Sequence, residues 1–191
     1  RRQAQVPFAH ANFREGQESL SSEVEESLAQ GCHLLLGAPT GYGKTAAVLY
    51  AALRHAYATD RRVFFATART TQQQIAHDVA RQVAAKGLPL RAVQIRAREK
   101  VCLNDVVLCR PESCDFAADY HDKVRESELI DRLWTDDGRG SGTPTVDDLV
   151  SLADRHQACP FALSMDGLEY ADLVIGDFNY LFDPGVRLST I

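Results

Sequence analysis

The sequence LLLGAPTGYGKTAAVLY, residues 34–50, joins an apolar run, a glycine-rich turn and a second segment with apolar residues at helical spacing. This order predicts a buried strand over residues 32–37, then a loop, then a helix over residues 44–58. Residues 38–45 match the Walker A spacing G-x-x-x-x-G-K-[ST], with Ala38 at the position of the first glycine. The pattern predicts a loop that binds phosphate at the start of a helix.

The residue types in this loop suit a nucleoside triphosphate. Gly41 and Gly43 let backbone N–H groups turn inward, which makes an anion-binding nest at a helix N-terminus. Lys44 is expected to reach the β- and γ-phosphates, and the Thr45 hydroxyl to bind Mg²⁺. We therefore expect ATP and Mg²⁺ as cofactors, with Lys44 and Thr45 as the catalytic candidates. The predicted nucleotide contacts in the loop are Pro39, Thr40, Gly41, Tyr42, Gly43, Lys44 and Thr45.

Strand and helix signals alternate around the loop. Further helices are predicted over residues 16–30, 71–86 and 145–156, and strands over residues 61–68, 90–97 and 171–177. An apolar stripe through Ile75, Val79 and Val83 supports the second of these helices. Thr145, with Asp148 three residues later, is a capping-box variant at the start of the third. This alternation predicts an α/β fold with a parallel sheet covered by helices.

The composition fits one globular domain, or a domain with a small insertion, since 45% of the 191 residues are hydrophobic and 25% are charged. The formal net charge of -5 argues against a whole-surface attraction to nucleic acid, so any phosphate contact must be local. We expect a cytoplasmic protein, or a nuclear one in a eukaryote, because no apolar run approaches the roughly 20 residues of a membrane span. The chain begins Arg1-Arg2 and its only methionine is Met165, which indicates an internal part of a longer reading frame.

Four of the five cysteines lie between residues 96 and 165, where the alternation of strands and helices breaks. Six, four and 44 residues separate the successive members of the set Cys102, Cys109, Cys114 and Cys159. This is not the paired C-x₂-C spacing of most structural zinc sites. Three close ligands and a distant fourth followed by proline are nearer to iron–sulfur usage. On spacing alone, a structural zinc site and four unrelated core cysteines stay open. Cys32 begins an apolar run and is expected in the core.

Six stretches carry a specific resemblance: FAHANFREGQ, GAPTGYGKT, ATARTTQQQ, REKVCLN, CPF and ADLVIGDFNYLFDP. In this order they resemble the XPD/DinG family of superfamily-two DNA helicases over nearly the whole chain. The resemblance implies an incomplete RecA-like P-loop motor domain with an inserted cysteine-rich subdomain. It also implies a [4Fe-4S] cluster held by the four cysteines. The implied parent is an ATP-dependent helicase of DNA repair or replication that moves 5′ to 3′ on single-stranded DNA.

The same resemblance assigns further site residues. Gln17, in FREGQ, resembles the glutamine that reads adenine, and Thr70, in ARTTQQQ, resembles a contact to the DNA backbone. Residues 96–110 carry a local excess of two positive charges. A solvated charged loop explains that excess nearly as well as a phosphate contact, and only the resemblance favours the contact. The basic DNA candidates are Arg96, Arg98 and Lys100, of which Arg98 matches a family arginine near the cluster and the DNA.

The expected organisation has three parts. Residues 1–95 form the first part of the motor domain, residues 96–165 the cluster subdomain, and residues 166–191 a return to the motor domain. Gly37 stands where many relatives have an acidic residue, and Tyr42 where a small side chain is usual, but neither removes a backbone donor. The DEAH motif and the second motor domain are expected in the remainder of the parent helicase. We therefore expect the isolated chain not to turn over ATP.

Two other functions stay open, and one acidic residue bears on them. Asp177 ends an apolar strand and is expected to cap it, with a Walker B aspartate as the alternative. The first rival function is a P-loop ATPase or kinase with a structural zinc lobe. A measurement of iron content would distinguish it from the iron–sulfur helicase. The second is a non-catalytic redox-sensing DNA-binding module. A measurement of nucleotide binding would distinguish it from the helicase.

Overall fold

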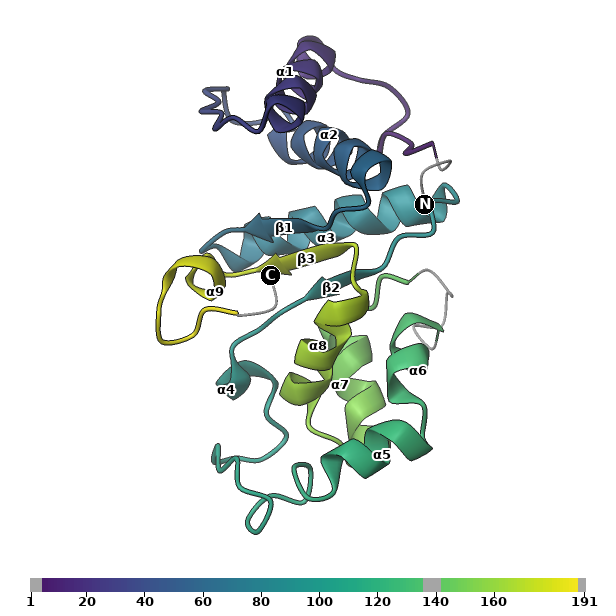
Figure 1. Ribbon diagram of the computed structural model, residues 1–191, viewed down its shortest axis with the longest axis vertical. Coiled ribbons are helices and arrows are strands. Elements are labelled where there is room, and N and C mark those ends of the chain that lie inside the picture. Colours follow the sequence, from purple (N-terminus) through teal and green to yellow (C-terminus); the bar gives the residue numbers. More distant parts are fainter. Residues whose placement is uncertain (1–4, 136–141, 189–191) are drawn as a thin grey trace.

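The computed structural model describes residues 5–135 and 142–188, and a three-stranded parallel sheet lies at its centre (Figure 1). The strands are β1 (Val63–Ala66), β2 (Ala92–Gln94) and β3 (Leu173–Gly176), in the order β1-β3-β2. Val174 of β3 pairs with Phe64 of β1 on one side and with Val93 of β2 on the other. The expected α/β fold with a parallel sheet is confirmed.

The central strand β3 is buried along its whole length, and its side chains enter two different cores. Successive residues of a strand point to opposite faces of the sheet. Leu173 and Ile175 belong to the core on one face, and Val174 belongs to the core on the other. A continuous apolar run is what a strand covered on both faces requires.

Helices α2 (Lys44–Thr59) and α3 (Thr70–Ala85) cover the first face. They contribute Leu49, Leu53, Val79 and Val83 to its core. Helix α1 (Gln17–Gln30) lies against α2 through Leu20 and Val24. It ends at Gly31, whose φ of 68° is the left-handed conformation that a side chain disfavours. The helices expected over these parts of the sequence are confirmed.

The segment between β2 and β3 folds back onto the second face of the sheet (Figure 1). Leu133, Trp134, Leu149 and Leu163 join Val174 in this core. Within the described residues, no helix combines the length and apolarity that a membrane crossing requires. The elements beyond β2, apart from β3, are α4 (Arg98–Val101), α5 (Tyr120–Glu126), α6 (Leu129–Thr135), α7 (Val146–Arg155), α8 (Pro160–Gly167), the 3₁₀ turn Leu168–Tyr170 and α9 (Asn179–Phe182).

The start of α7 is the capping box that the sequence predicts. The Thr145 hydroxyl accepts a hydrogen bond from the Asp148 N–H at 3.1 Å, and the Asp148 carboxylate accepts one from the Thr145 N–H at 2.9 Å. Two of the N–H groups that a helix start leaves unpaired are thereby satisfied within four residues of sequence.

The strand predicted over residues 32–37 is not formed. This segment is extended but unpaired, and the side chain of Leu35 is 98% exposed. Cys32, expected in the core, is also exposed. A strand is stable only when a neighbour takes up its backbone hydrogen bonds, and none of the described strands lies beside this segment.

The apolar stripe predicted on α3 is correct for Val79 and Val83 and wrong for Ile75, which is 50% exposed. The buried face of the helix instead begins at Gln73 and continues through Ala76 and Ala80. Small residues on this face allow the helix to lie close to the sheet, so packing rather than hydrophobicity alone sets its rotation.

The described histidine with the deepest burial is His77, which is fully buried on α3. Its Nε2 lies 2.9 Å from the Pro144 carbonyl, which can only accept, so Nε2 donates and Nδ1 is unprotonated. Nδ1 has no hydrogen-bond partner among the described residues. Burial lowers the pKa of His77 below its usual 6.5, and this outweighs the opposing effects of the Pro144 carbonyl and of Asp78.

We predict that the free energy of unfolding falls as the pH drops below about 6.5. In that range His77 binds a proton in the unfolded chain but stays neutral in the folded chain, because its pKa is lower there. The contribution of His77 to the free energy of unfolding is fully present above about pH 6.5. It is lost as the pH falls toward the lower pKa that His77 has in the folded state. Its slope is at most about 1.4 kcal/mol per pH unit. In urea titrations between about pH 5 and pH 8, His77→Gln should flatten that slope. The exposed His121, changed to Gln, should not; equal slopes in both variants would contradict the assignment.

Candidate functional site

The phosphate loop ends on the first turn of α2. Gly41 and Gly43 both have φ of 79°, in the left-handed region, and Gly43 is the N-cap of the helix. The loop therefore presents its amides at the positive end of a 16-residue helix. Lys44 folds back over the loop, where its Nζ donates to the Ala38 and Pro39 carbonyls, each at 2.7 Å.

The segment before α1 holds the outer side of this loop. The Arg14 guanidinium donates to the Gly41 carbonyl at 2.7 Å. The Gln17 side chain is 1% exposed and donates to the Tyr42 carbonyl at 2.9 Å and to the Gly43 carbonyl at 3.3 Å. Three consecutive carbonyls of the loop thus accept hydrogen bonds from residues 14 and 17.

Tyr42, the bulky residue of the loop, fits because Gly16 has no side chain. A Cβ at Gly16 would overlap the Tyr42 hydroxyl oxygen, and the φ of Gly16 is 78°. Any other residue at position 16 would meet both a clash and a strained backbone. The large side chain at position 42 and the glycine at position 16 are therefore complementary.

A cavity of about 830 Å³ lies at the carboxyl edge of the sheet. Thr70 comes from the segment after β1, residues 96–100 follow β2, and residues 177–180 follow β3. Parallel strands end at the same edge, which is where open α/β sheets bind their ligands. All four residues predicted to contact DNA line this one cavity: Thr70, Arg96, Arg98 and Lys100.

The wall of this cavity combines cations with aromatic rings. Three basic side chains, at positions 96, 98 and 100, face two acidic ones, Glu99 and Asp177. Burial, together with these two carboxylates, raises the pKa of Tyr180, so its phenol stays protonated. The Arg98 guanidinium lies 4.6 Å from the ring centroid of Phe161. Tyr180 and Phe161 were not expected here, because no local sequence pattern links either residue to the basic stretch.

The strand-end role expected for Asp177 agrees with its hydrogen bond. Its Oδ1 accepts from the Asn179 N–H at 2.9 Å, which caps the turn into α9. The carboxylate also lines the cavity with the basic residues.

The four cysteines from the segment between β2 and β3 meet at a second, enclosed cavity of about 30 Å³. They are Cys102, Cys109, Cys114 and Cys159. The Asn104 side chain donates to the Cys114 sulfur at 3.2 Å. In residues 5–135 and 142–188, no three His, Cys, Asp or Glu side chains are arranged to hold a single metal ion. The four cysteines predicted as cluster ligands thus line one cavity, and their role as ligands stays a prediction.

Arg98 and Phe161 line both cavities. The cysteine cavity and the basic cavity are therefore adjacent and share one wall. A movement of either residue changes the shape of both.

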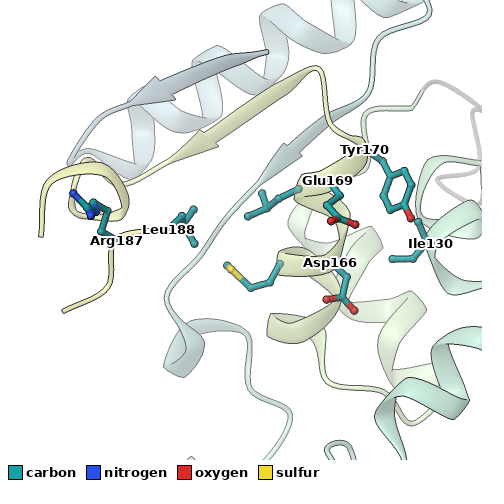
Figure 2. A pocket seen from close by; sticks show the side chains of 8 residues that line it. Ile130, Asp166, Glu169, Tyr170, Arg187 and Leu188 are labelled. Carbon is teal, nitrogen blue, oxygen red and sulfur yellow. The ribbon is translucent and has the colours of Figure 1, made fainter. Parts of the chain in front are cut away.

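A third cavity, of about 570 Å³, lies apart from the predicted site residues. Figure 2 shows Asp166, Glu169 and Tyr170 on one side of it and Arg187 on the other. Asp166 accepts a hydrogen bond from the Tyr120 hydroxyl at 2.8 Å, so α8 is tied to α5 behind this wall. Burial is the main cause that raises the pKa of Tyr120, which keeps it a donor.

Comparison of the sequence with known proteins places the chain in a family. The DEAD_2 family model matches residues 66–191, more than half of the chain. The chain belongs to the DEAD_2 family. The matched part contains the basic cavity and all four cysteines, while the phosphate loop precedes it. Membership of the DEAD_2 family, together with the relatives below, confirms the resemblance to the XPD/DinG-type helicases.

Three relatives illustrate the similarity. The chain is 24% identical to the general transcription and DNA repair factor IIH helicase subunit XPD of Arabidopsis thaliana, over 95% of this chain and 27% of the relative. It is 25% identical to a regulator of telomere elongation helicase 1 homolog of Oryza sativa subsp. japonica, over 87% of this chain and 21% of the relative. The human regulator of telomere elongation helicase 1 is 26% identical over 48% of this chain and 8% of the relative. The chain thus spans about a quarter or less of these proteins.

We predict a graded reactivity of the thiols in protein prepared without metal. Cys109 is exposed and Cys114 is buried, so iodoacetamide should modify Cys109 far sooner. The measurement is the alkylation rate at each cysteine by mass spectrometry, divided by the rate at the same site in denatured protein. Cys32, which is exposed and remote from the cavity, serves as the reference. A native Cys114 that reacts as fast as Cys109 would contradict the described packing.

Proposed function

We propose that this chain is the ATP-binding and DNA-contacting part of an ATP-dependent helicase that carries a [4Fe-4S] cluster. The parent enzyme would move 5′ to 3′ on single-stranded DNA during repair or replication. Membership of the DEAD_2 family and the helicase relatives support the class of enzyme. The remainder of the parent, with the DEAH motif and a second motor domain, would complete the machinery for hydrolysis and movement.

One observation carries the proposal: the four DNA candidates, drawn from two different strand ends, line one cavity that also contains two aromatic rings. The basic side chains suit the phosphates of a nucleic acid. Phe161 and Tyr180 suit unpaired bases, whose faces are free to stack, whereas the bases of a duplex already stack on one another. The combination favours a single strand over a duplex.

The phosphate loop supports the nucleotide part of the proposal. On binding ATP, Lys44 would exchange its two carbonyl partners for the β- and γ-phosphates. Thr45, on the first turn of α2, would bind Mg²⁺ through its hydroxyl. The amides around Gly41 and Gly43 would stabilise the phosphate charge by donating hydrogen bonds.

The type of donor at the cysteine cavity supports the proposed cluster. Four thiols face one enclosed space, and thiolates are the ligands that iron–sulfur clusters use. Cys102, Cys109, Cys114 and Cys159 would hold this cluster through their thiolates. When bound, it would cross-link the chain around α4, the loop at residues 109–114 and the start of α8. Its contribution would be rigidity beside the DNA cavity.

The proposed division into residues 1–95, 96–165 and 166–191 has one structural qualification. The helices of the middle part share a core with β2 and β3 through Val93 and Val174. In this division the proposed cluster subdomain would pack on the motor domain and would not be joined to it by a linker alone.

We predict that the chain binds a fluorescent oligodeoxythymidylate weakly and in a salt-dependent manner. Each phosphate contact on a single strand contributes about 0.7 to the slope of log K against log salt, so Lys100→Ala and Arg98→Ala should each reduce that slope by about this amount. The measurement is fluorescence anisotropy over a salt series. Arg155→Ala, which removes an exposed arginine at the end of α7, is the matched control. Unchanged slopes for both cavity variants would refute the proposed strand path.

We also predict that protein purified without oxygen is brown and contains about four irons and four sulfides per chain. Cys102→Ser, Cys109→Ser, Cys114→Ser and Cys159→Ser should each lose the visible absorbance. Cys32→Ser should keep it, because Cys32 does not line the cavity. Stoichiometric zinc in protein made with ample iron and sulfide would instead favour a structural zinc lobe.

A further inference from the structure

The side chain of Gln17 has its hydrogen-bonding groups already engaged. A carboxamide has two N–H donors and one carbonyl oxygen. Nε2 donates to the Tyr42 and Gly43 carbonyls, and Oε1 accepts from the Arg14 N–H at 2.8 Å. Gln17 is 1% exposed, and its hydrogen bonds to Arg14, Tyr42 and Gly43 are partly buried.

These contacts oppose the role in reading adenine that the sequence implies for Gln17. A glutamine reads adenine with one N–H donor and its carbonyl oxygen directed together at the base edge. Both donors of Gln17 point at the loop. Turning the side chain toward a base would remove this donor from the partly buried Tyr42 carbonyl, which is unfavourable, whereas the Gly43 carbonyl would keep the Ala47 N–H at 3.3 Å.

The same contacts determine where the loop directs its amides. In a trans peptide the carbonyl of one residue and the N–H of the next lie in one plane and point in opposite directions. No cis peptide bond occurs in the described residues. Holding the Tyr42 carbonyl away from the phosphate side therefore directs the Gly43 N–H toward it. The Gly43 carbonyl accepts from both Gln17 and the Ala47 N–H, each at 3.3 Å, and these two donors together direct the Lys44 N–H in the same way. Arg14 does the same for the Tyr42 N–H through the Gly41 carbonyl.

Gly43 itself is shaped for this contact. A Cβ at Gly43 would overlap Nε2 of Gln17. The glycine thus serves two requirements, the left-handed φ of 79° and the close approach of the glutamine. Tyr42 lies against Gly16 on the other side, so the start of α1 and the loop are fitted together.

We infer that Gln17 is a positioning residue for the phosphate loop and supports triphosphate binding irrespective of the base. This inference rests on the proposed nucleotide function. Gln17 orients the amide of Gly43 toward the phosphates and shares with the Ala47 N–H the orientation of the Lys44 amide. Through α1 it couples the nucleotide site to the segment that precedes that helix. Discrimination between adenine and guanine does not come from this side chain.

Calorimetry with Mg-ATP, Mg-GTP and magnesium tripolyphosphate tests the inference, because the third ligand has no base. Gln17→Ala should weaken all three by a similar factor of about tenfold, as the loss of one or two hydrogen bonds predicts. The ratio of ATP to GTP affinity should stay that of the wild type. Loss of ATP binding alone, with GTP and tripolyphosphate unaffected, would overturn the inference in favour of base reading. No change with any ligand would overturn it as well.

Two further variants separate positioning from a loss of folding. Gln30→Ala removes an exposed glutamine at the other end of α1 and should bind all three ligands as the wild type does. Gln17→Glu keeps the size and the acceptor for Arg14 but has no donor for the loop, so it should bind tripolyphosphate less well than Gln17→Ala. Wild-type affinity in Gln17→Glu would refute the positioning role. If instead the wild type bound no nucleotide, or Lys44→Ala bound as tightly, the proposed nucleotide site itself would be wrong.

Discussion

The burial of β3 on both faces is the constraint on which the rest of the molecule depends. Its backbone pairs with β1 and β2, so the ladder hydrogen bonds are satisfied away from water. Its side chains then require apolar cover in two directions, and the two layers of helices supply it from different parts of the sequence. The segment between β2 and β3 is thus part of the central packing. Its cysteines and basic residues lie where they do because Leu133 and Leu163 must cover the sheet.

The parallel arrangement has a direct chemical consequence. The carboxyl ends of three strands meet at one edge, and the chain that leaves each end contributes to a single cavity. Arg98 stands at the boundary, over the ring of Phe161, and faces both this cavity and the one lined by thiols. A rigid group held by the cysteines would therefore limit the movement of the arginine that we propose as a nucleic-acid contact. The proposed cluster would then have a mechanical role close to the proposed path of the strand.

The phosphate loop obeys a related rule of geometry. A loop that binds anions through its amides must direct its carbonyls elsewhere, and those carbonyls need donors. Here Arg14 and Gln17 supply the donors from a segment more than 20 residues away in sequence. Lys44 meanwhile satisfies the carbonyls of Ala38 and Pro39. The loop is thus preformed apart from the lysine, whose movement to the phosphates is the main local change that binding requires.

The sequence by itself determined the features whose cause lies within a few residues. The capping box at Thr145 and Asp148, the stop of α1 at Gly31 and the glycines of the phosphate loop follow from local hydrogen bonds and from φ. The apolar run at residues 171–177 was enough to predict the strand β3. The convergence of the cysteines was also predictable, although only from the resemblance to a family and not from their spacing.

Only the tertiary structure decided the rest, because the causes lie between segments distant in sequence. The apolar residues 32–37 predict a strand, yet a strand needs a neighbour, and sequence pattern does not report one. Ile75 is apolar at helical spacing but faces outward, since close packing of Ala76 and Ala80 sets the rotation of α3. The acceptors of the Gln17 side chain are backbone carbonyls, which every residue possesses. The residue types in the sequence therefore do not predict these partners. Backbone acceptors and packing partners become visible only when the chain is folded.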